Sequence, residues 1–288
     1  MLGVLTVPQN YHERIVIRTF LDQLKIDKNI IKVYFLLDNH VVGKEKSIND
    51  IGANDILYLN STFSGRANHF GEKLYRWFKL SKYMHPNARY IGKIDDDVIF
   101  CLRHVYANIL QVDQGSGLIY YGWQHQYDNG SNTEWQSVRT SMHKFRLDEF
   151  FIVVGHKLVS RIIERPYVGC MPHNCNSTII LNGNNTIFDW DYGGVSLGHW
   201  LSIYPDVRFY PMNHMFIYIH VTKFKMGKHR NDTERNSSFT YHQLAQPFCA
   251  HHWSYHKAHI SEMLLFSKDL ERYALNTSVD FTQSILKV

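Results

Sequence analysis

The stretch Tyr90-Ile91-Gly92-Lys93-Ile94-Asp95-Asp96-Asp97-Val98-Ile99-Phe100 places three consecutive carboxylates between two apolar flanks. Such flanks are typical of a strand that is buried on both faces. Neighbouring carboxylates repel one another, and a buried carboxylate without a partner is costly. A strand end therefore carries this triplet mainly where a cation neutralises it. The competing interpretation is a solvated acidic turn, which the apolar flanks disfavour.

Oxygen ligands decide which cation the triplet would suit. In an extended chain Asp95 and Asp97 point to one side and Asp96 to the other. Carboxylates alone favour a hard ion such as Mg²⁺ or Mn²⁺, with substrate phosphates completing the coordination shell. The sequence therefore predicts a divalent-metal site that receives a phosphorylated substrate.

Strand and helix patterns alternate along the first part of the chain. Apolar runs predict strands over 2–7, 31–37, 55–59 and 90–100, and helical periodicity predicts helices over 12–24 and 69–84. This alternation predicts an open, mostly parallel α/β sheet, with the triplet at its ligand-binding carboxyl edge. Further on we expect helices over 102–112 and 155–163, strands over 118–123, 150–154 and 207–221, and loops over 124–148, 169–187 and 222–240.

Composition describes a globular protein with a mild positive charge. The chain has 288 residues, 44% hydrophobic residues and a net charge of +5 before its 18 histidines are counted. A hydrophobic fraction of this size supplies a sizeable core, and we find no nucleic-acid-binding signature and no run long enough to span a bilayer. The chain as given is therefore expected to be soluble or to have lost a leader or anchor.

Two features favour the secretory pathway. Six Asn-x-Ser/Thr sequons begin at Asn60, Asn176, Asn184, Asn231, Asn236 and Asn276. Four cysteines, Cys101, Cys170, Cys175 and Cys249, form an even set with three pairings open. The alternative is four buried free thiols in a cytosolic enzyme.

Two further groups of residues are candidates for ligand binding. Arg14 and Arg18 lie four residues apart on the first helix, where they either meet an anionic ligand or form a solvated face. His252 and His256 are also four apart, so a helix would place them on one face. His256 is then a candidate ligand of the acidic site's metal; a structural zinc site with Cys249, or ordinary surface or core histidines, are the alternatives.

A second acidic pair precedes a glycine pair and a helical pattern. Asp189 and Asp191 stand before Gly193-Gly194, and Val195 to Leu201 carries helix-like apolar spacing. Acids at this position are either helix caps or groups that act on a substrate.

Several of these segments, in this order, resemble the β-1,3-glycosyltransferases of the galactosyltransferase family 31 type. Lys93–Ile99 matches the family's "K-x-D-D-D-V-F", and the likeness covers most of the chain through short pieces. The other matching segments are Arg14–Phe20, with Phe20 in place of Trp; Val33–Leu37; Asp55–Phe63 followed by Lys73 and Trp77, without the family's Asn-Leu-Thr; Phe151–Arg161; Asp189–Leu197; and His256–Met263, with Ile260 in place of Pro.

The resemblance implies a GT-A fold in one catalytic domain over residues 1–288, with a nucleotide-sugar half (1–112) and an acceptor half (113–288). It implies inverting transfer of galactose or N-acetylglucosamine from a UDP-sugar to an acceptor glycan. It further implies localisation in the Golgi lumen behind an N-terminal membrane anchor that this chain does not contain.

The resemblance also implies roles for individual residues. Mn²⁺ or Mg²⁺ would be held by Asp97, with Asp95 or Asp96 assisting and His256 completing the shell. Asp191, or else Asp189, would be the general base. The candidates for donor contact are Arg18, Lys73, Lys93, Asp95 and Asp96, and Trp123 or Trp135 would stack on the acceptor unless they pack in the core.

Two other classes of function compete with sugar transfer. The first is a glycan-binding relative without activity, which the departures at Phe20, Trp190 and Ile260 leave open. The second is a metal-dependent hydrolase of nucleotide-sugars that uses water in place of an acceptor.

Overall fold

The structure is a computed structural model of all 288 residues. The residues it describes are 1–23, 27, 29–39, 53–60, 70–100, 102–123, 147, 150–164, 168–171, 174–180, 194, 197–198, 201, 204–212, 216–218 and 254–256. They group into two compact units, the first within Met1–Tyr11, Ile31–Asp95 and Val112–Asn213, the second within His12–Ile30, Asp96–Gln111 and His214–Val288.

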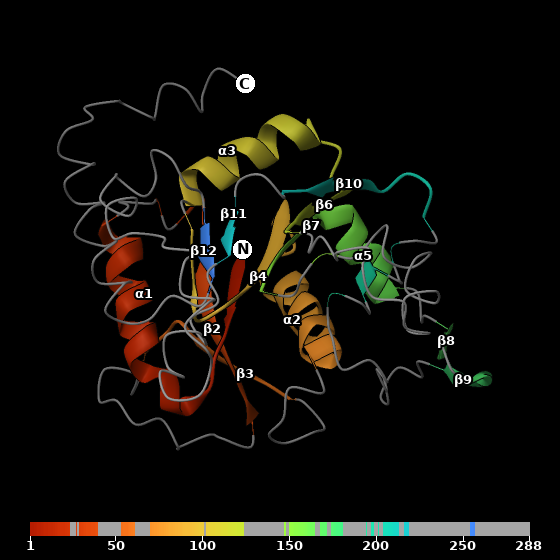
Figure 1. Ribbon diagram of the computed structural model, residues 1–288, viewed down its shortest axis with the longest axis horizontal. Helices are drawn as coiled ribbons and strands as arrows, with labels where there is room; N and C mark the ends of the chain where they lie inside the picture. The colour runs from red at the N-terminus through yellow and green to blue at the C-terminus, as the bar shows by residue number, and fades with distance from the viewer. Residues whose placement is uncertain are drawn as a thin grey trace, which may run out of the picture. The chain divides into compact units, whose positions relative to one another are not determined.

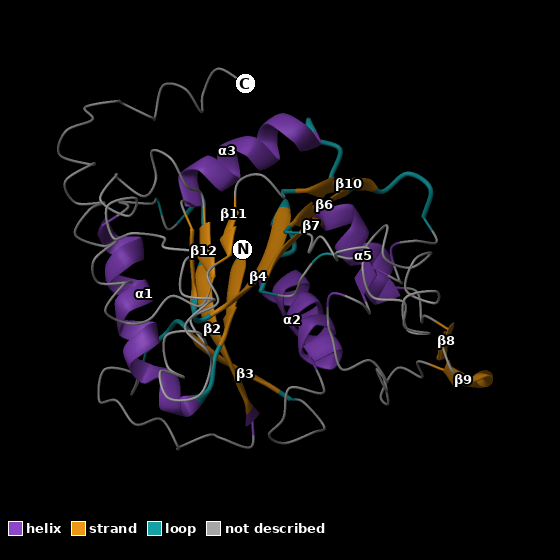
Figure 2. Cartoon of the chain, viewed as in Figure 1, coloured by secondary structure: helices purple, strands orange, loops and turns teal. Residues whose placement is uncertain are grey.

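A seven-stranded sheet forms the first unit, in the order β10-β6-β7-β4-β1-β2-β3 (Figure 2). Every strand runs parallel to β4 except β7, which is antiparallel to both of its neighbours. The predicted α/β class with an open, mostly parallel sheet is therefore confirmed. The strands are β1 (Leu2–Leu5), β2 (Val33–Asp38), β3 (Ile56–Leu59), β4 (Tyr90–Asp95), β6 (Ile119–Gly122), β7 (Phe151–Gly155) and β10 (Arg208–Pro211).

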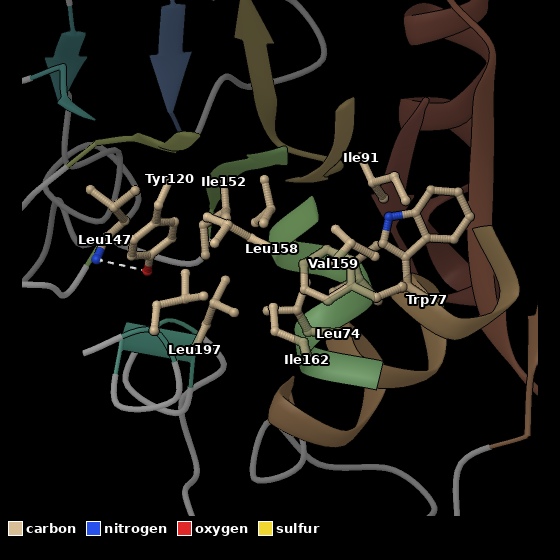
Figure 3. Packing of buried hydrophobic residues seen from close by; sticks show 14 of the residues in the cluster. Leu74, Trp77, Ile91, Tyr120, Leu147, Ile152, Leu158, Val159, Ile162 and Leu197 are labelled. Carbon is tan, nitrogen blue, oxygen red and sulfur yellow. Dashed lines mark hydrogen bonds between the residues drawn. The ribbon is translucent and has the colours of Figure 1, made fainter. Parts of the chain in front are cut away.

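Two helices of this unit, α2 (Phe70–Met84) and α5 (His156–Glu164), pack against each other and against β4 (Figure 1). Their apolar side chains meet those of the sheet in one core, where Trp77, Ile91 and Leu158 are fully buried (Figure 3). Trp77 also donates its indole N–H to the carbonyl of Gly92 at 2.8 Å. This hydrogen bond satisfies the one polar atom of a buried indole and joins α2 to the central strand.

Asp113 organises the amino-terminal edge of the sheet. It ends α3 (Leu102–Asp113), is 1% exposed, and accepts hydrogen bonds from the Tyr90 hydroxyl at 2.8 Å, the Ser116 hydroxyl at 2.5 Å and the Gly117 N–H at 3.0 Å. Burial raises the pKa of Asp113, but these hydrogen bonds more than offset it, so the pKa lies below its ordinary value of 3.8. Asp113 therefore has a structural role, because its carboxylate oxygens accept hydrogen bonds from neutral donors at or just before the starts of β4 and β6.

The second unit contains most of α1 (Tyr11–Gln23) and of α3, and a sheet in the order β11-β12-β5. The strands are β5 (Val98–Phe100), β11 (Phe216–Tyr218) and β12 (Ser254–His256). A helix would have placed His252 and His256 on one face, but residues 254–256 are extended and pair with β5 and β11. His252 lies outside the described residues.

Part of the region predicted as a loop over 169–187 is an antiparallel hairpin of β8 (Val168–Met171) and β9 (Asn174–Ile180). Cross-strand backbone hydrogen bonds give this polar, Cys-containing segment regular structure that its composition did not indicate. Between β9 and β10, Gly194, Leu197, Gly198 and Leu201 adopt helical conformation, and both leucines are buried. A search of the described residues for a helix long and apolar enough to cross a membrane finds none.

Candidate functional site at the carboxyl edge of the sheet

The carboxyl ends of four parallel strands gather polar residues at one edge of the first unit. Thr6 follows β1, Asp38 ends β2, Asn60 follows β3 and Asp95 ends β4. The register pairs Leu5 of β1 with Leu36 of β2 and Asp95 of β4, so β2 continues two residues beyond the level of Asp95 before it ends at Asp38. In open α/β sheets this edge is where ligands bind.

Asp95 is held by a lysine from its own strand. Lys93 stands two residues earlier on β4, so both side chains leave the same face, and its Nζ forms an ion pair with the Asp95 Oδ1. Lys93 is 2% exposed and the Asp95 side chain 29%. The pair therefore runs from the buried interior of the sheet to its edge, and it places a cation beneath the first acid of the triplet.

The chain turns immediately after Asp95. Asp96 and Asp97 form a turn between β4 and β5, which belong to different sheets. The extended backbone assumed in the prediction that Asp95 and Asp97 share one side is therefore wrong, because the strand ends at Asp95. Asp96 is 8% exposed, and the Asp97 Oδ1 is shielded from solvent. The simple solvated turn is thus also a poor description of this segment.

A second ion pair, absent from the sequence predictions, lies at the same edge. Lys73, near the start of α2, contacts Asp38 at the end of β2 with 2.7 Å between Nζ and Oδ2. Both side chains are mostly buried, at 13% and 12% exposed. Asp38 could have been suspected from its place after a buried strand. Its pairing with Lys73 depends on how α2 returns to the sheet, and no local pattern records that.

His256 lies close to the acidic turn along the backbone of the second unit. In the antiparallel ladder of β12 and β5 it stands opposite Val98, the residue that follows Asp97. Opposed residues in such a ladder have Cβ atoms roughly 5 Å apart. The structure thus joins two segments that are far apart in the sequence, although the His256 side chain is outside the described part of the chain.

The remaining predicted site residues are either buried to different degrees or lie outside the described part of the chain. Arg14 is fully buried, so it does not belong to a solvated helix face, and Arg18 is half-buried. Trp123 is 8% exposed and packs on Phe150 with ring centroids 4.8 Å apart, which favours the core role over acceptor stacking. Asp189, Asp191 and Trp135 lie outside the described residues, as do Cys101, Cys249 and the sequons that begin at Asn184, Asn231, Asn236 and Asn276.

The donor set of the acidic turn suits a hard divalent cation. Within the described side chains no three His, Cys, Asp or Glu residues gather as a complete metal cluster. Carboxylates at Asp96 and Asp97, however, offer the oxygen ligands that Mg²⁺ and Mn²⁺ use when phosphates supply the rest of the shell. The carboxylates of the turn are therefore of the ligand type that such a metal takes, while the described side chains alone do not assemble a group that could hold it.

Among known proteins, the chain is similar to solved structures of low sequence identity. No protein-family model matches the chain, and no curated protein sequence matches it. The galactosyltransferase LgtC, in complex with donor and acceptor sugar analogues, is 10% identical over 98% of this chain and 99% of its own, with a TM-score of 0.44. Mouse xyloside xylosyltransferase 1 is 12% identical over 88% and 96% of the two chains, with a TM-score of 0.44.

A glycosyltransferase involved in glycosylation of the major capsid of PBCV-1 is 10% identical over 94% and 98% of the two chains, with a TM-score of 0.41. Likenesses of this extent leave the activity of the present chain to be argued from its own residues.

Proposed function

We propose that this protein transfers a hexose, galactose or N-acetylglucosamine, from a UDP-sugar to a hydroxyl of an acceptor glycan, with inversion and formation of a β-1,3 linkage. The observation that carries the proposal is the acidic triplet, whose first member Asp95 ends the central strand at the carboxyl edge and pairs with the buried Lys93. The family resemblance of the same segment supports it.

Each residue of the edge has a chemical task in this proposal. Asp97, with Asp95 or Asp96, would hold Mn²⁺ or Mg²⁺, and His256, opposite Val98, would complete the ligand set. When bound, the metal supplies positive charge that stabilises the departing diphosphate. Lys73 and Arg18 would contact the donor's anionic groups, and Asp191, or else Asp189, would accept the proton of the attacking acceptor hydroxyl. The sequons support a Golgi location for this reaction.

The first test measures binding of UDP in the presence of Mn²⁺. We expect UDP and Mn²⁺ together to raise the thermal midpoint of the wild type. Asp97→Asn should abolish that rise, and its thermal midpoint in the absence of ligand should equal that of the wild type. Asp206→Asn is the matched control, because Asp206 is an exposed acid just before β10, whose start lies at the other edge of the sheet. An unchanged response in Asp97→Asn would remove the metal role from this residue.

The second test separates transfer from its alternatives. UDP release from a panel of UDP-sugars is measured with Mn²⁺, with and without a panel of acceptor glycans. Release that requires an acceptor supports transfer, and release without one supports hydrolysis. Retained glycan binding with no release of UDP supports a binding protein. Phe20 and Ile260, which depart from the family pattern, are the reason for testing this outcome.

A further inference from the structure

Lys93 occupies a position where a charged group is costly. It lies in the middle of β4, level with Gly3 of β1 and Ile152 of β7, and only 2% of its side chain is exposed. Ile91 of the same strand and Ile152 beside it belong to the apolar core under α2 and α5, and Figure 3 shows both within that cluster. An ammonium in such surroundings is retained only when a partner compensates its lost hydration.

Gly3 keeps this part of the core compact. A Cβ on Gly3 would lie 2.5 Å from Leu36 Cδ1 and 2.6 Å from Trp77 Cε2, so Leu36 and Trp77 fill the space above the glycine. They pack directly beside the row of the sheet that contains Lys93. The lysine side chain therefore runs within packed apolar groups, and its Nζ reaches the edge by meeting Asp95.

This geometry separates Lys93 from the other cations of the site. A donor molecule bound at the carboxyl edge would meet Asp95, which is 29% exposed, before it met Lys93, which is 2% exposed and paired to that carboxylate. We propose that Lys93 is a positioning residue: it acts on the nucleotide only through Asp95, by holding the carboxylate in one place at the edge. The inference rests on the proposed function, and it replaces direct donor contact as the role of Lys93.

The distinguishing experiment is a double-mutant cycle read out by ligand binding. The Kd of UDP at saturating Mn²⁺ is measured by calorimetry for the wild type, Lys93→Met, Asp95→Asn and the double variant. Electron paramagnetic resonance of Mn²⁺ then reports how much of the metal is bound together with UDP. Lys79→Met, on the exposed face of α2, is the matched control for loss of a lysine.

We expect Lys93→Met to weaken UDP binding by roughly tenfold or more, as removal of a group that orients a ligand-binding residue does. In the Asp95→Asn background the same substitution should change the Kd by less than about twofold, since nothing remains to be positioned. Lys93→Arg, which keeps the charge, should restore part of the binding. A merely structural role would lower stability in these variants without this pattern of coupled binding.

Three outcomes would overturn the inference. Equal losses from Lys93→Met in both backgrounds would mean that the ammonium acts on the nucleotide directly. An unchanged Kd in the single variant would mean that it has no part in binding. If the wild type itself does not bind UDP with Mn²⁺, the proposed function fails and the inference fails with it. If Lys93→Met does not fold, the Kd of UDP is compared between the wild type and Lys93→Arg and between Asp95→Asn and the double variant. These two comparisons then test the inference.

Discussion

The two ends of β4 both involve an aspartate, and they treat it in opposite ways. At the amino end, the hydroxyl of Tyr90 and three other groups surround Asp113, which is 1% exposed. At the carboxyl end, Asp95 is 29% exposed and is held by one buried cation from its own strand.

The contrast separates a structural acid from an acid available to a ligand. Neutral donors that fill both oxygens of Asp113 stabilise the fold and leave little for a substrate to add. A single cation beneath Asp95 balances the carboxylate while one side of it still faces the edge. The two aspartates therefore differ in the type of partner and in residual exposure.

The largest loss of stability is expected at the amino end of β4, where Asp113 is enclosed (the closed end). Asp113→Ala should lower the free energy of unfolding by about 3 kcal/mol, because the Tyr90 hydroxyl and the Gly117 N–H lose a buried acceptor. Urea unfolding followed by circular dichroism measures the loss. The contrast also requires that the folded variant bind UDP and Mn²⁺ like the wild type; weaker binding would mean that Asp113 influences the site.

At the carboxyl end of β4, where Asp95 is partly exposed (the open end), the loss of stability should be smaller, and a second substitution should reverse it. Lys93→Met should cost about 2–3 kcal/mol, somewhat less than for a fully buried pair because Asp95 is partly exposed. Adding Asp95→Asn should recover most of that stability, since no charge is then left in apolar surroundings. The measurement is chemical unfolding of all three variants. Additive losses would show that the two side chains are not coupled.

The second ion pair of the edge should matter less to the fold. Lys73→Met removes the partner of Asp38 and should cost about 1–2 kcal/mol, because both groups retain some access to water. If Lys73 also meets the donor, UDP affinity in Mn²⁺ should fall roughly fivefold, which corresponds to about 1 kcal/mol. Calorimetry on Lys73→Met beside Lys79→Met tests this, and equal affinities would restrict Lys73 to holding Asp38.

The smallest expected effect is a dependence on pH at the closed end. The folded-state pKa of Asp113 lies below its ordinary value of 3.8, so its stabilising contribution is complete above that value. It is lost as the pH falls through the lower folded-state pKa. The stability difference between the wild type and Asp113→Asn should therefore be constant above about pH 5 and narrow below about pH 4. A difference that widens on acidification would contradict the assignment.

Local sequence patterns were enough for most of the elements. The alternating apolar runs predicted β1, β2, β3 and β4 with the helices between them, and the structure confirms each one. They also placed the acidic triplet at the end of β4. The turn at Asp96 could not be predicted from these patterns. The same residues fit either an extended backbone or a turn at a point where the chain passes from one sheet to another.

The amino-acid sequence by itself determined the order of strands and helices, the mostly parallel sheet and the acidic end of its central strand. Hydrophobic periodicity acts between near neighbours, and the sequence displays near neighbours directly. Only the tertiary structure decided that Lys93 pairs with Asp95 and Lys73 with Asp38, that Asp113 is enclosed by the start of β4, and that His256 lies opposite Val98. Apart from the pair within β4, these contacts join segments that are distant in the sequence, and the packing of buried surfaces brings those segments together.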